Sequence, residues 1–122
     1  MDFAPSPRAA DLAARVRRFV DDRIEPAETV ISADVRRRRA EGSDPWPPHP
    51  LIAELQTEAR AQGLWNLFLP AGHEGPYAVR YGTDGGTGLT NCDYAVVAEQ
   101  TGRSVLAPLI LNCNAPDTGN ME

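Results

Sequence analysis

The glycine-rich stretch at residues 82–88 is the first candidate for chemistry, because a glycine loop before a helix can hold a phosphate through backbone N–H groups. It reads Gly-Thr-Asp-Gly-Gly-Thr-Gly. It lacks the Gly-Lys-Ser/Thr ending of a P-loop, and residues 86–91 lack the third glycine of the dinucleotide-binding motif. No pattern of alternating strands and helices surrounds it. We therefore predict a flexible loop, since loops are rich in glycine for conformational reasons alone.

A run of four arginines, Arg36 to Arg39, could bind nucleic acid or an acidic partner. On a helix these four side chains point around most of the circumference and form no single basic face. Asp34 and Glu41 flank the run, and the chain has a net charge of −5. Phosphate binding needs a basic face, so we expect no nucleic-acid partner. The run is predicted to be a solvated helix end, where the helix dipole favours arginine.

The remaining polar residues predict no metal site and no catalytic residue in this chain. His49 and His73 have no ligand at metal-binding spacing, and Cys92 and Cys113 belong to no metal-binding pattern. A disulfide between the two cysteines stays open, although no secretory context favours one. No serine or cysteine lies in a nucleophile motif. The helix-spaced carboxylates fit ordinary polar faces: Glu25 with Glu28, and Glu54 with Glu58.

Two asparagines interrupt an apolar stretch near the end of the chain. Asn112 and Asn114 precede the sequence Ala-Pro-Asp. Buried amides need hydrogen-bond partners. Either these side chains cap backbone groups between two helices, or they line a ligand cavity, and the sequence favours neither.

Helices must position these residues. Ser6 and Pro7 predict a helix start, and the residues that follow have helical apolar spacing: Ala9, Leu12, Ala13, Val16, Phe19 and Val20. Pro26 should break or kink this helix near Ile24. A second helical pattern then ends before Gly42.

The middle of the chain predicts a linker, a third helix and an extended segment. Residues 43–50 contain four prolines, and we expect Trp46 to pack against a helix. A helix is predicted from about Pro50 to Gln62, with Gly63 as its stop. Residues 64–69 form a short apolar run, which predicts a buried extended segment.

Two more helices are predicted after the loop at residues 70–89. Thr90 should cap the first of them, with Asp93 as the acid of a capping box and an end at Gly102. Ser104 should cap the second, which we expect to run from Val105 to about Cys113. Since that helix is apolar on nearly every side, it should be buried. The fold class is therefore all-α, with about five helices and one short extended segment in a single domain, 1–122.

The last residues read as the start of another helix. Asp117 or Thr118 could cap it, and Glu122 would lie in its first turn. We therefore expect the front part of a larger protein, or a protein completed by a partner. No signal peptide and no membrane span is recognisable, which predicts a cytoplasmic protein.

Several segments in this order resemble the N-terminal helical domain of acyl-CoA dehydrogenases, in particular the branch with longer-chain or unusual acyl substrates. They are residues 61–70, 86–99, 102–104 and 112–122. The resemblance implies a three-part flavoenzyme that uses FAD and acts on an acyl-CoA, and a homo-oligomer when complete. A glutamate of the C-terminal bundle removes the α-proton while FAD accepts a hydride. That base and most flavin contacts lie in the missing middle and C-terminal domains. The resemblance therefore assigns no catalytic or cofactor-binding residue here.

The same resemblance implies that this domain forms a wall of the acyl pocket. The residues carried over as pocket-lining candidates are Leu106, Ala107, Ile110, Leu111 and Asn114. Around Pro76 to Gly85 the chain has an insert of roughly ten residues relative to the family pattern, which is long for a loop in a compact domain. Alone the chain should have no dehydrogenase activity. The alternatives are a non-catalytic subunit that complements a partner, and a small helical acyl-CoA-binding protein.

Overall fold

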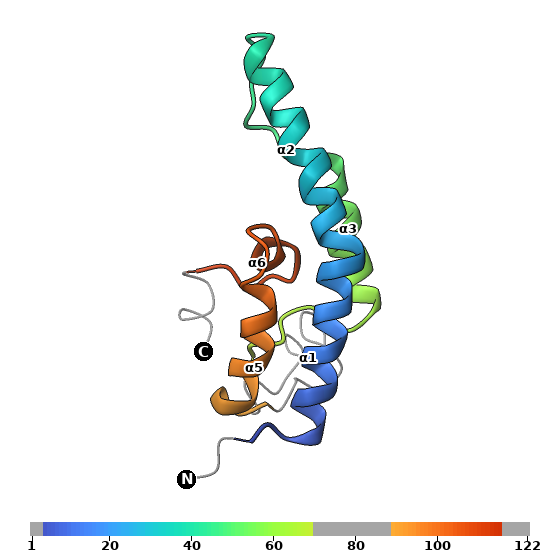
Figure 1. Cartoon of the computed structure of the whole chain (residues 1–122), viewed down its shortest axis with the longest axis vertical. Coiled ribbons are helices and arrows are strands. Elements are labelled where there is room, and N and C mark those ends of the chain that lie inside the picture. The colour runs from blue at the N-terminus through green and yellow to red at the C-terminus, as the bar shows by residue number, and fades with distance from the viewer. Residues whose placement is uncertain (1–3, 70–88, 116–122) are drawn as a thin grey trace, which may run out of the picture.

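The computed structural model describes residues 4–69 and 89–115. Its elements, shown in Figure 1, are α1 (Pro7–Phe19), η1 (Val20–Ile24), α2 (Glu25–Ala40), α3 (Pro50–Ala61), α5 (Asn91–Thr101) and α6 (Ala107–Ile110). Within the described residues the structure is helical and has no strand, which confirms the predicted all-α class. The predicted glycine loop, the insert and the final helix start lie outside the described residues.

One long helical rod, formed by α1, η1 and α2, runs through the molecule (Figure 1). The side chain of Ser6 accepts a hydrogen bond from the Ala9 N–H at 3.2 Å and caps α1, as predicted. Pro26 does not break the rod. It has no N–H for the usual bond, and the Glu25 N–H instead donates to the Val20 carbonyl, five residues back. The π-helical turn accommodates the proline without a break in the rod. At the predicted break the hydrogen bonds change register instead, from four residues back to five.

The core lies along one side of this rod. Its buried apolar residues come from every helix: Ala9, Leu12, Val16, Phe19, Val20, Ile24, Ala27, Ile31, Leu55, Ala59, Leu64, Leu67, Leu89, Val97, Ala107, Ile110 and Leu111. Helix α1 packs against α5, and α6 packs against α3. The apolar face predicted for the first helix is confirmed, since all of its residues are buried except Ala13, which is half-buried.

Polar contacts join the elements at the edges of this core. The side chain of Thr90 accepts from the Asp93 N–H at 3.1 Å and caps α5, as predicted. The Asp93 carboxylate has a different role from the predicted capping box, because it accepts the Ser6 N–H at 2.8 Å and joins the starts of α1 and α5. Arg23 lies 3.0 Å from the carboxylate of Glu58 on α3, and this hydrogen-bonded pair raises the pKa of Arg23.

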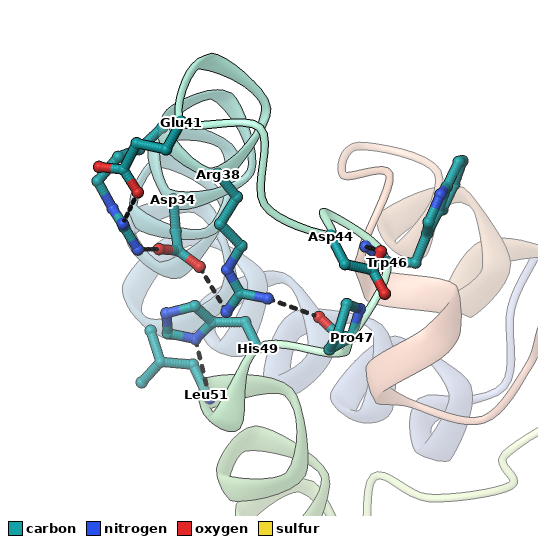
Figure 2. Close-up of polar contacts among 9 residues, drawn as sticks. Asp34, Arg38, Glu41, Asp44, Trp46, Pro47, His49 and Leu51 are labelled. Carbon is teal, nitrogen blue, oxygen red and sulfur yellow. Dashed lines mark hydrogen bonds and ion pairs between the residues drawn. The ribbon is translucent and has the colours of Figure 1, made fainter.

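The far end of α2 is a solvated helix end, as predicted for the arginine run. The carboxylate of Asp34 lies 2.5 Å from the guanidinium group of Arg37 and 2.8 Å from that of Arg38. Figure 2 shows the side chains of Asp34 and Arg38 pointing toward each other. The hydrogen bond from Arg37 lowers the pKa of Asp34. Arg37 also pairs with Glu41 at 2.7 Å. These contacts stabilise the last turns of α2 locally. Arg36, Arg37 and Arg39 are exposed, whereas Asp34 and Arg38 are half-buried, so the run forms no common basic face.

The proline-rich linker that follows is held by its backbone. Arg38 donates to the Pro47 carbonyl at 3.2 Å, and the Asp44 side chain accepts the Trp46 N–H at 3.0 Å (Figure 2). The Trp46 ring is 81% exposed, so the expectation that it packs against a helix is wrong. His49, which is part of the predicted linker at residues 43–50, caps α3 by accepting the Leu51 N–H on Nδ1 at 3.2 Å.

The segment after α3 is buried, but it is not straight. Gly63, with φ +68°, ends α3 as predicted. Asn66 then has φ +57°, and its carbonyl accepts the Leu69 N–H at 3.1 Å, so residues 64–69 bend through a turn. The predicted extended segment is therefore a buried turn. Apolar composition indicated its burial but not its backbone conformation.

The last described helix is much shorter than predicted. Helix α6 is the single turn Ala107–Ile110, whereas the sequence predicted a helix from Val105 to about Cys113. The side chain of Ser104 accepts the Leu106 N–H at 3.1 Å before the helix begins. Val105 is 82% exposed, so the expected burial on all sides is also wrong. Asn112, with φ +56°, then ends the helix.

Across the described ranges, no helix combines the length and apolar character needed to cross a membrane.

Candidate functional site

The turn around α6 brings all the predicted pocket residues together. A four-residue helix gains little from its own hydrogen bonds, so other elements must hold it. Gln56 of α3 donates from Nε2 to the Leu109 carbonyl at 3.1 Å. The Asn66 N–H donates to the Leu111 carbonyl at 3.2 Å. Two carbonyls at the end of α6 are thus satisfied by α3 and by the turn after it.

The five pocket candidates differ in what they contact. Ala107, Ile110 and Leu111 are buried in the core of the described chain. Leu106 and Asn114 are half-buried and keep accessible surface at this turn. Within the described residues, these last two are the candidates that are still available to a ligand.

The structure gives Asn112 a hydrogen-bond partner that sequence reasoning missed. Its Nδ2 donates to Oδ1 of Asn66 at 2.5 Å. Asn66 is buried in the turn after α3. The sequence left open whether Asn112 caps backbone groups between two helices or lines a ligand cavity. Its contact with the Asn66 side chain favours a structural role, although the partner is an amide side chain and not the backbone. An asparagine inside the apolar run at residues 64–69 was the available sequence signal, because a buried amide needs a partner.

The two thiols of the chain are free and lie in different environments. Cys92 is exposed, whereas Cys113 is half-buried beside the α6 turn. Burial raises the pKa of Cys113, and hydrogen bonds with Tyr94 and Thr101 act in the opposite direction.

We predict that iodoacetamide at pH 8 alkylates Cys92 about tenfold faster than Cys113, because the thiolate is the reactive form and burial disfavours it. Peptide mapping by mass spectrometry after timed quenching measures both rates. In denaturant the two rates should converge. Equal rates in the folded chain would contradict the placement of Cys113.

A shallow hollow of about 460 Å³ lies along the polar side of α2. Its lining residues are Glu25, Glu28, Thr29, Ser32, Arg36 and Arg103. Arg103 pairs with Asp21 at 2.7 Å and lies 3.7 Å from Glu25. Ser104 donates to Glu28 at 2.8 Å. The hollow is lined by two carboxylates and two guanidinium groups, so its lining has no net charge to attract a charged ligand.

Metal binding finds no support in residues 4–69 and 89–115, where no three histidine, cysteine, aspartate or glutamate side chains gather around a common point.

Comparison with known proteins identifies the relatives of this chain. No protein-family model matches it. It is 40% identical over 121 residues to acyl-CoA dehydrogenase family member 11 of Rattus norvegicus, covering 98% of this chain and 14% of the rat protein. It is 45% identical over 123 residues to the probable acyl-CoA dehydrogenase FadE2 of Mycobacterium tuberculosis, covering 100% of this chain and 26% of that protein.

A solved structure shares the fold. The structure described as "a putative acyl-CoA dehydrogenase from Mycobacterium abscessus" matches 97% of this chain with a TM-score of 0.78 and 43% identity. The chain covers 27% of that structure. The resemblance predicted from the sequence is confirmed: over nearly its whole length, this chain is a homologue of one segment of acyl-CoA dehydrogenases. It spans about a quarter or less of the length of these relatives.

Proposed function

We propose that this chain is the N-terminal helical domain, 1–122, of an FAD-dependent acyl-CoA dehydrogenase and forms part of the wall of its acyl pocket. The observation that carries the proposal is the match in sequence and fold, over 97% of the chain, to a structure described as "a putative acyl-CoA dehydrogenase". The relatives named acyl-CoA dehydrogenases agree with it.

In the proposed enzyme, FAD accepts a hydride from the acyl chain after a carboxylate base has removed the neighbouring proton. By the family resemblance, the base and most flavin contacts come from the middle and C-terminal domains. The proposal therefore assigns neither the base nor a flavin-binding residue to this chain.

The share of this chain is to shape and dry the pocket. Leu106 and Asn114 lie half-buried on a turn whose Ala107, Ile110 and Leu111 are buried in the core. In this proposal the apolar side chain of Leu106 binds the alkyl tail by removing it from water, and Asn114 lies beside it. Excluding water also strengthens the electrostatic interactions at the reacting carbons. The proposal includes a homo-oligomer as the complete enzyme.

The direct test is an activity assay on the native polypeptide that carries these residues, purified from its source cells. It should reduce an electron-accepting dye when an acyl-CoA is added, and it should show a flavin absorbance spectrum. The isolated 122-residue chain, assayed in parallel, should do neither. Turnover by the isolated chain, or a native polypeptide without flavin and without acyl-CoA oxidation, would contradict the proposal.

A further inference from the structure

Two asparagines adopt a backbone conformation that normally favours glycine. Asn66 has φ +57° and Asn112 has φ +56°, and they are the two non-glycine residues with positive φ in the described part of the chain. Side chains other than that of glycine are disfavoured there, although asparagine is tolerated better than most. A glycine at either position would lower the conformational free energy of the left-handed backbone. The presence of asparagine there therefore suggests that its side-chain amide has a role.

Three helix ends of this chain allow a direct comparison. Helices α2, α3 and α6 end with the same closing bond from an N–H to a carbonyl five residues back. The three bonds are Ser43 to Arg38 at 2.9 Å, Leu64 to Ala59 at 2.8 Å, and Cys113 to Pro108 at 2.8 Å. The left-handed residue of this motif is usually glycine. It is Gly42 for α2 and Gly63 for α3, but Asn112 for α6.

The side chain of Asn112 is what distinguishes the third end. Its Nδ2 donates to Oδ1 of Asn66 at 2.5 Å. The backbone N–H of Asn66 donates to the Leu111 carbonyl at 3.2 Å. These two bonds, which we call the amide clasp, join the turn after α3 to the turn after α6. Asn66 is only 2% exposed, so water hardly competes for its amide.

We propose that Asn66 and Asn112 are positioning residues that hold the α6 turn against the acyl tail and so set the acyl-chain length that the pocket accepts. The clasp touches no substrate itself and acts through Leu106 and Asn114 on the turn that it holds. This inference rests on the proposed function for its catalytic consequence. Without the clasp, the single-turn helix can shift and discrimination between acyl lengths is lost.

The test compares Asn112→Gly with Gly42→Asn in the native polypeptide. Asn112→Gly keeps the left-handed backbone and deletes the amide of the clasp. Gly42→Asn is the matched control, because it makes the reverse change at the end of α2, where nothing lies within 4 Å of an added Cβ. Asn66→Gly and the double variant complete a cycle, which isolates the pairwise contribution.

Hydrogen exchange of the Leu111 and Cys113 amides reports how firmly the turn is held. Asn112→Gly should speed their exchange, although the glycine also relieves the left-handed backbone, which acts in the opposite direction. The cycle cancels this relief, and its coupling should be about fivefold, which corresponds to one hydrogen bond. Gly42→Asn should leave the exchange unchanged. Additive effects of the two substitutions in the double variant, with no coupling, would overturn the inference.

Selectivity between acyl-chain lengths distinguishes a positioning role from a purely structural one, because a purely structural role would leave it unchanged. The ratio of kcat/KM for a long-chain acyl-CoA to that for a medium-chain acyl-CoA should shift about threefold or more in Asn112→Gly, mainly through KM. It should not shift in Gly42→Asn. An active enzyme whose ratio stays constant overturns the positioning role alone. A wild-type polypeptide that does not oxidise acyl-CoA overturns the proposed function and, with it, this consequence of the clasp.

Discussion

Replacing Phe19 with alanine should lower the free energy of unfolding of this chain by about 3–5 kcal/mol. Phe19 is 3% exposed and lies where α1 passes into the π-helical turn. The substitution removes a buried aromatic ring and leaves a cavity in the core. The cavity cannot easily close, because the helical rod continues on both sides of residue 19 and holds the backbone in place. Urea unfolding followed by circular dichroism measures the loss, because the midpoint shifts at constant slope.

The control for this prediction is Trp46→Ala, which removes a larger aromatic side chain. Trp46 is 81% exposed, and its recorded hydrogen bond uses the backbone N–H. Its substitution should therefore change the free energy of unfolding by no more than about 0.5 kcal/mol. If Trp46→Ala destabilised the chain as much as Phe19→Ala, the assignment of the core to the inner side of the rod would be wrong.

Ile110→Ala should lower the free energy of unfolding by about 2–4 kcal/mol, although Ile110 lies in a helix of four residues. Ile110 is fully buried and belongs to the same core as α1 and α3. Burial holds this turn in place, because its own backbone bonds are too few to do so. Thermal and urea unfolding of the variant chain give the value.

Val105→Ala is the matched control for Ile110→Ala, because Val105 precedes the same turn and is 82% exposed. It should be nearly neutral, within about 0.5 kcal/mol. A small loss for Ile110→Ala would mean that its side chain faces an open cavity. That result would move Ile110 from the core to the pocket surface.

Local signals in the sequence predicted most helix boundaries correctly. Ser6 and Thr90 cap their helices as expected, and Gly42, Gly63 and Gly102 follow helix ends. These features depend on hydrogen bonds within four residues, so the local sequence carries the information. The spacing of apolar residues likewise indicated the buried face of α1.

The errors have local and long-range causes. Pro26 is accommodated by a local change of hydrogen bonding, from the Glu25 N–H to the Val20 carbonyl, so it does not break the rod. The linker around Trp46 is likewise held by short-range bonds with Asp44 and Arg38. The turn around α6, in contrast, is held by Gln56 of α3 and by Asn66, and such tertiary contacts cannot be inferred from neighbouring residues.

The candidate pocket residues stay a prediction. The resemblance pointed to residues 106–114, and the structure places them on and beside α6. The sequence did not show which of them the core would cover, since burial depends on segments more than forty residues away. Asn66 was missed for the same reason: its partner Asn112 lies 46 residues further along the chain.

Photoaffinity labelling shows directly whether residues 105–114 line the acyl pocket. A long-chain acyl-CoA that carries a photoreactive group at the end of its tail is bound to the native polypeptide, irradiated and mapped by mass spectrometry. If this chain forms part of the pocket wall, the label should be found within residues 105–114, with Leu106 and Asn114 as the favoured positions. The label should be lost when unmodified acyl-CoA competes. An active enzyme that is labelled at its acyl pocket, but nowhere within residues 105–114, would show that this chain does not form the pocket wall.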